Sequence, residues 1–117
     1  MGTNIIKNKS FDFAIRIIGL YKFLVENKRE YVMSKQLLRS GTAIGALVRE
    51  AEYAESKADF IHKLSISLKE ANESEYWIEL LLKTGYIERE NYEAIIIDLK
   101  SILKLLISII KTSKENR

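Results

Sequence analysis

The sequence predicts an all-α protein: a single domain over residues 1–117, folded as an antiparallel up-and-down four-helix bundle. The 117 residues include no proline and only five glycines, a composition that argues against a turn-rich β architecture. A chain of this length holds one hydrophobic core rather than two. Four segments repeat their apolar residues every three or four positions, which is the period of an amphipathic helix, and short polar stretches separate them.

The first predicted helix follows a loose basic arm at residues 1–9 and runs to about Asn27. Ser10 has a hydroxyl that can accept a free N–H at the helix start, and Asp12 suits the positive end of the helix dipole. Polar positions within this helix form only one narrow stripe. Because a surface helix of a monomer needs a polar face about as wide as its buried face, this helix carries more apolar surface than one bundle can bury.

An exposed turn at residues 28–30 leads into the second predicted helix, from near Ser34 to about Glu55. Its middle is rich in small residues and includes Gly41 and Gly45, each of which costs about 1 kcal/mol relative to alanine in a helix. The close approach of a neighbouring helix, or a local kink, would explain them. A phosphate-binding glycine loop would need a preceding strand and a following Gly-Lys-Ser/Thr, and the sequence has neither.

The third predicted helix opens at Ser56, which forms a capping box with Asp59 in the place of the usual glutamate. A Lys-Thr-Gly sequence ending at Gly85 closes it. The fourth helix is expected from about residue 89 to Lys111, followed by a charged tail at residues 112–117 that frays. Its apolar residues exceed what one buried face requires, so we expect the first and fourth helices to meet other copies of the protein.

The sequence contains no recognisable catalytic apparatus. It has no cysteine, so a thiolate metal site cannot form, and its single histidine leaves little choice for a Ser-His-Asp or His-Glu arrangement. His62 fits a surface or boundary position better than a general base or a metal ligand. We therefore expect no enzyme, no metal and no cofactor. The N-terminal residues lack the apolar core of a signal peptide, and no apolar run approaches the roughly 20 residues of a membrane span, which suits a cytoplasmic protein without membrane contact.

Charged residues on the second and third helices could serve either chemistry or structure. Glu70 and Glu73 share a helical face with Ile66 and Trp77, and paired carboxylates can carry out acid–base catalysis. The interpretation we favour is structural, with the acids accepting salt bridges across helices or across a subunit boundary. The residues assigned this structural polar role are Arg39, Glu50, Glu70 and Glu73. Trp77 and Tyr76 are expected to pack in the bundle, with base stacking as the alternative.

Basic residues are concentrated in the N-terminal third of the chain. The net charge is +3, but residues 1–40 hold eight basic residues against three acids (+5), and residues 41–117 hold eleven against thirteen (−2). This asymmetry is either uneven surface decoration or a basic face that meets phosphate, which symmetric assembly would multiply. The candidate phosphate contacts are Lys7, Lys9, Arg16, Lys22, Lys28, Arg29, Lys35 and Arg39.

Several short motifs together resemble a known family. They are the run QLLRSGTAIGA at residues 36–46, Glu50-Ala51, Ser56 with Asp59-Phe60, and Lys69-Glu-Ala71 with Glu73 and Tyr76-Trp77. This combination resembles the bacterial four-helix bundle proteins encoded within 23S rRNA intervening sequences, which are similar in fold to the accessory variability protein of diversity-generating retroelements. The resemblance implies a homopentameric barrel of antiparallel bundles, no known enzymatic activity, and a role in binding nucleic acid or a nucleic-acid enzyme.

One position departs from the family pattern, because Leu47 stands where the family usually has asparagine. The hydrogen bond of that asparagine is therefore absent here, although leucine suits a helix interior. The sequence as a whole favours a non-enzymatic, homo-oligomeric bundle, a pentamer by resemblance, that binds RNA or DNA by charge. The alternative is a protein-interaction module whose oligomer docks a nucleic-acid enzyme such as a reverse transcriptase.

Overall fold

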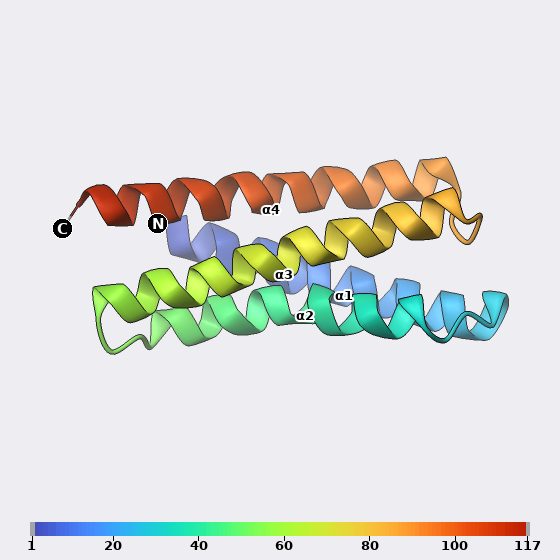
Figure 1. The fold of residues 1–117 in the computed structure, drawn as a ribbon, viewed down its shortest axis with the longest axis horizontal. Coiled ribbons are helices and arrows are strands. Elements are labelled where there is room, and N and C mark those ends of the chain that lie inside the picture. Colours follow the sequence, from blue (N-terminus) through green and yellow to red (C-terminus); the bar gives the residue numbers. More distant parts are fainter. Residues whose placement is uncertain (1, 117) are drawn as a thin grey trace.

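The computed structural model describes residues 2–116 and confirms the all-α four-helix bundle (Figure 1). Its elements, in chain order, are α1 (Gly2–Lys28), α2 (Met33–Glu52), α3 (Lys57–Lys83) and α4 (Arg89–Glu115). Consecutive helices run antiparallel, and α1 also packs on α4, so the four form a closed ring around one core. The bundle measures 48 × 21 × 19 Å, with the α1–α2 and α3–α4 turns at one end and the α2–α3 turn at the other.

The loose arm predicted for residues 1–9 is wrong over residues 2–9, which are the first turns of α1. Ile6 is fully buried, and its spacing to Ser10 and Phe13 extends the core-facing side of the helix toward the N-terminus. Ser10 is therefore not a cap: it lies buried inside the helix, and its hydroxyl donates to the carbonyl oxygen of Ile6 at 2.7 Å. Met1 lies outside the described residues.

The frayed tail predicted for residues 112–117 is also wrong over residues 112–115, because α4 continues to Glu115. No glycine or proline interrupts the helix after Ile110, the last buried residue of its core face. The Asn116 backbone N–H donates back to the Thr112 carbonyl oxygen, and the Lys57 side chain donates to the Asn116 carbonyl oxygen. These bonds hold the end of α4 against the start of α3. Arg117 lies outside the described residues.

The two glycines inside α2 mark a close approach of α1, as predicted. A Cβ atom added to Gly41 would lie 3.0 Å from the side chain of Ile17, and one added to Gly45 would lie 3.3 Å from the Ser10 carbonyl oxygen. The helix runs unbroken through both positions. These glycines therefore do not kink the helix. Because they have no side chain, they let α1 and α2 pack at short range.

Small serines line the opposite contact, between α2 and α3. Ser40 and Ser74 are buried with their hydroxyl oxygens 2.9 Å apart, and the Ser67 hydroxyl donates to the Ile44 carbonyl oxygen at 2.9 Å. Within the described residues, every buried side-chain nitrogen and oxygen has a hydrogen-bond partner. The serines therefore allow close packing without leaving a polar atom unsatisfied.

The predicted boundaries of α3 are confirmed by its caps. The Asp59 N–H donates to the Ser56 hydroxyl oxygen at 3.0 Å, as the capping box requires, and Gly85 follows the helix with φ +85°. None of the four helices, taken over the described residues, has the length and apolar character needed to cross a membrane.

Candidate nucleic-acid interface

The eight cations predicted to contact phosphate divide into two groups. Lys7, Arg16 and Arg39 form ion pairs with carboxylates of neighbouring helices. The other five are exposed and form no ion pair or hydrogen bond with any side chain or backbone group of residues 2–116: Lys9, Lys22, Lys28, Arg29 and Lys35. The charge of the first group is already compensated within the protein, so the surface available for phosphate is smaller than the sequence indicates.

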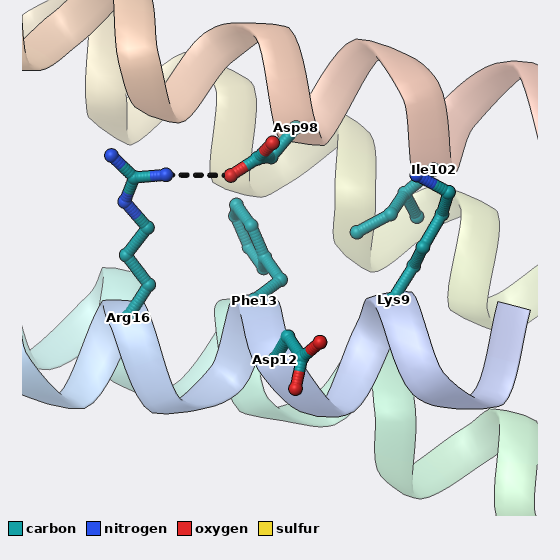
Figure 2. A pocket seen from close by; sticks show the side chains of 6 residues that line it. All are labelled: Lys9, Asp12, Phe13, Arg16, Asp98 and Ile102. Carbon is teal, nitrogen blue, oxygen red and sulfur yellow. Dashed lines mark hydrogen bonds and ion pairs between the residues drawn. The ribbon is translucent and has the colours of Figure 1, made fainter.

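Arg16 lies in a groove between α1 and α4 that is about 270 Å³ in volume (Figure 2). Its guanidinium reaches across to the Asp98 carboxylate at 2.6 Å, beside the ring of Phe13 on the floor of the groove. Lys9 and Asp12 also line the groove. Two cations and two carboxylates leave this groove with no net charge, so it offers an anion little attraction.

Arg39 of α2 bridges two acids of α3. Its guanidinium donates to Glu70 at 3.2 Å and to Glu73 at 2.5 Å, and the Trp77 indole N–H also donates to Glu73, at 3.0 Å. The bond to Glu73 is the main reason that the pKa of Arg39 is raised. The bond from Trp77, followed by the bond from Arg39, lowers the pKa of Glu73. Glu73 is therefore held ionised as an acceptor, which suits a cross-helix tie and not a proton donor.

The remaining candidates from the sequence lie apart from this cluster. Glu50 pairs with Lys63 of α3 at 2.9 Å, which again joins α2 to α3. His62 is exposed on α3. Trp77 packs against the core as predicted, whereas the packing predicted for Tyr76 is wrong, because Tyr76 is exposed. Over residues 2–116, no three histidine or acidic side chains come together as metal ligands would. The four residues assigned a structural polar role thus lie at the α2–α3 contact, three of them in one cluster.

The turn between α1 and α2 is held by Glu30. The prediction that Glu30 is exposed in this turn is wrong. Glu30 is only 7% exposed, and its carboxylate accepts the backbone N–H groups of residues 32–34 at 2.7–3.1 Å. Arg29 adopts a left-handed conformation, φ +54°, and the Glu30 N–H donates to the Leu24 carbonyl oxygen at 3.0 Å. Both helix ends are thereby closed within one short turn.

The ionisation of Glu30 follows from these bonds. Burial alone would raise the pKa of Glu30, but the backbone N–H groups of Met33, Ser34 and Val32 and the hydroxyl of Ser34 lower it. Their combined effect exceeds that of burial, so the pKa lies below its ordinary value of 4.5. A sequence signal was present: an acid just before a helix start is a typical partner for its free N–H groups.

Four of the unpaired cations lie in this turn or on the parts of α1 and α2 next to it, and we call them the basic end: Lys22, Lys28, Arg29 and Lys35. Lys22 lies six residues before the end of α1, which is about 9 Å along the helix axis. This distance is about the length of three nucleotides of one nucleic-acid strand. The Lys28 ammonium also lies 5.9 Å from the centroid of the Phe23 ring. Within residues 22–35 the acids are Glu30, whose carboxylate is occupied by N–H groups, and the exposed Glu26.

The outer side of α1 carries an apolar stripe formed by Phe11, Ile15 and Ile18. Their spacing of four and three residues places them along one side of the helix, and they are 49%, 56% and 39% exposed. The Arg49 guanidinium lies over the Phe11 ring at 5.1 Å, so the stripe runs beside α2. The excess apolar surface predicted for the first helix is confirmed. For the fourth helix the excess is smaller than predicted, because the large exposed hydrophobic residues of α4 are only Ile97 and Ile107.

Comparisons with known proteins agree with this architecture. A crystal structure of a protein of unknown function, from the S23 ribosomal protein family of Bacteroides thetaiotaomicron VPI-5482, is 65% identical to the chain with a TM-score of 0.94. The match covers 95% of this chain and 99% of that chain. A comparison with curated proteins finds no match. The profile of the 23S rRNA-intervening sequence proteins matches residues 3–108, and the chain therefore belongs to that family.

Proposed function

We propose that the protein is a non-enzymatic, self-associating bundle that binds RNA or DNA through phosphate contacts at the basic end. The observation that supports this most directly is the group of four exposed cations without carboxylate partners around a turn held by its own hydrogen bonds. The association of the family with 23S rRNA intervening sequences points to the same class of ligand. These cations reach phosphate oxygens and no base edges, so the binding fixes position without reading sequence.

Each copy supplies only a few phosphate contacts, so a single copy binds weakly at physiological salt. Association of several copies would bring several basic ends onto one nucleic acid, and linked contacts raise the overall affinity without any new kind of contact. Self-association and nucleic-acid binding are therefore parts of one proposal, and each can be measured separately.

Removing two cations of the basic end should weaken binding in a way that depends on salt. For the double variant Lys28→Ala/Lys35→Ala, we expect the slope of log affinity against log salt for a structured RNA to become shallower by about 1.5, at 0.7–0.9 per lost phosphate contact. Fluorescence anisotropy over a salt series measures it. The matched control is Lys104→Ala/Lys111→Ala, which removes the same charge from exposed positions on α4.

Two results would count against nucleic-acid binding at this end. Absence of wild-type binding at low salt contradicts the proposed function itself. If the slope of log affinity against log salt decreases equally in both double variants, binding depends on net charge and not on a defined site. That result contradicts the assignment to the basic end.

We infer that copies of the protein meet through the apolar stripe, in a closed ring that the family resemblance expects to be a pentamer. Three large apolar side chains in a row, 39–56% exposed, form a contiguous patch of the kind that marks an interface. Arg49 beside Phe11 adds an aromatic–cation pair, and both residue types are enriched in interface centres.

Placing a charge in the stripe should break the assembly. We expect Ile15→Asp to sediment as a folded monomer under conditions in which the wild type is an oligomer, because a buried, unpaired carboxylate is costly at an interface. Ile97→Asp on α4, 66% exposed and outside the stripe, is the matched control and should leave the oligomer intact. A monomeric wild type at high concentration contradicts self-association and favours a different protein as the occupant of the stripe.

A further inference from the structure

The turn at the basic end carries an exposed aromatic residue that is close in sequence to its cations. Tyr31 is 58% exposed and lies two residues after Arg29 and four before Lys35, neither of which has a carboxylate partner. Burial does not explain a tyrosine in this position, since most of the ring remains in solvent. An exposed ring among unpaired cations is the combination that binds unpaired bases, with the ring stacking on the base and the cations contacting the phosphates.

The backbone on both sides of Tyr31 is fixed before any ligand arrives. Glu30 is held by backbone N–H groups of residues 32–34, by the Ser34 hydroxyl, which donates to its carbonyl oxygen, and by its own bond to Leu24. Tyr31 is thus enclosed by a hydrogen-bonded turn and is not part of a loose loop. Binding then orders little more than one side chain, which keeps the entropic cost of association low.

A second exposed tyrosine lies in a more acidic setting than Tyr31 does. Tyr53 is 85% exposed at the α2–α3 turn, at the opposite end of the bundle. It lines a hollow with three acids, Glu50, Glu55 and Asp59, and with two cations: Arg49, which lies over the Phe11 ring, and Lys63, which pairs with Glu50. Phosphates would be repelled there, so Tyr53 offers the same ring without the means to hold a nucleic-acid strand.

The basic end holds a second exposed aromatic residue in a similar arrangement. Phe23 is 39% exposed, and the Lys28 ammonium lies 5.9 Å from its ring centroid. Phe23 also lines a hollow of about 210 Å³ at the α1–α4 contact. A base lying on this ring would place its phosphate within reach of the flexible Lys28 side chain. Two rings with adjacent cations can therefore engage successive parts of one strand.

We propose that the basic end binds single-stranded nucleic acid in preference to duplex, with an unpaired base stacked on Tyr31. This inference rests on the proposed nucleic-acid binding and specifies its ligand. In a duplex the base faces are stacked on one another, so the ring of Tyr31 has no base to contact and only the phosphate interaction remains. Stacking on a ring face accepts every base, so the site favours unpaired segments of any sequence.

The test compares the affinities of the whole protein for one unstructured oligonucleotide, free and annealed to its complement, in RNA and DNA versions. We expect tighter binding of the free strand, and a loss of affinity for that strand of roughly 5- to 150-fold in Tyr31→Ala, because stacking on one ring is worth about that much. The salt slope should not change, since no cation is removed. Tyr31→Phe should restore binding, and Tyr53→Ala should bind as the wild type does.

The outcomes separate this inference from the proposal on which it rests. If duplex binds as tightly as the free strand, or if Tyr31→Ala binds as the wild type does, the stacking site is wrong while salt-dependent binding stands. If neither form binds at low salt, both proposals are wrong. Because Tyr31 is exposed, unchanged melting of the variants verifies that the comparison is between folded proteins.

Discussion

Replacing Gly41 with valine is expected to lower the free energy of unfolding by about 3 kcal/mol, the upper part of the range for overpacked cores. Even a single Cβ at this position would lie 3.0 Å from two side-chain carbons of Ile17. Ile17 is fully buried and β-branched, so it has little freedom to move aside. Valine adds two methyl groups beyond that Cβ, and α1 and α2 must separate to admit them. Urea unfolding of the folded variant measures the loss.

Gly19 provides the control within the same pair of helices. A Cβ added to this exposed glycine of α1 meets nothing within 4 Å, so Gly19→Ala should gain about 1 kcal/mol from helix propensity alone. The two glycines should thus respond in opposite directions to an added side chain. A Gly41→Val variant as stable as the wild type would show that the α1–α2 contact is looser than its geometry indicates.

The glycines illustrate how much of the fold could be predicted from the sequence. Three features were predicted from local sequence signals, and the structure contains each of them. They are the helix periodicity, the cap at Ser56 and the close packing at Gly41 and Gly45. The residues before Ser10 were wrongly predicted to be a loose arm, because their intrinsic helix propensity is low. Burial of Ile6 in the core stabilises the helix there, and this tertiary effect is not part of helix propensity.

The candidate site could be predicted only in part, for a related reason. Composition identifies which residues are basic, but the partner of each one is set by the packing of helices distant in sequence. Arg16 meets Asp98 and Arg39 meets Glu73 across 82 and 34 residues. Glu30 was missed for the opposite reason. Its partners are adjacent in sequence, but an acid before a helix start signals only that it can accept N–H groups, and not that its carboxylate is buried.

Replacing Glu30 with alanine is expected to destabilise the protein by about 3 kcal/mol. The change removes the acceptor of three backbone N–H groups at the start of α2, a loss of about 0.5–2 kcal/mol for a helix cap, and leaves the buried Ser34 N–H unpaired, at about 1–3 kcal/mol more. Glu26→Ala removes the same charge from an exposed position one turn earlier and should change stability by no more than about 0.5 kcal/mol.

The effect of Glu30 should also depend on pH. Because its pKa is lower in the folded protein than its ordinary value of 4.5, its carboxylate stabilises the fold fully above that value. The contribution is lost as the pH falls from about 4.5 through the lowered pKa, since protonation then weakens the bonds to the N–H groups. Unfolding measured over this range should show a smaller acid-induced loss in Glu30→Ala than in the wild type. Parallel curves would contradict this role of the carboxylate.

The same variant separates charge from geometry in nucleic-acid binding. Removing Glu30 makes the basic end more positive, so charge alone would strengthen the binding of a nucleic acid. It also frees the turn that holds Arg29 and Tyr31 in place, and a mobile turn must be ordered again when the strand binds. We therefore expect Glu30→Ala, under conditions in which it is folded, to bind an unpaired strand more weakly than the wild type despite its higher charge. Glu26→Ala gains the same charge with the turn intact and should bind at least as tightly, so stronger binding by both variants would show that the fixed turn does not contribute.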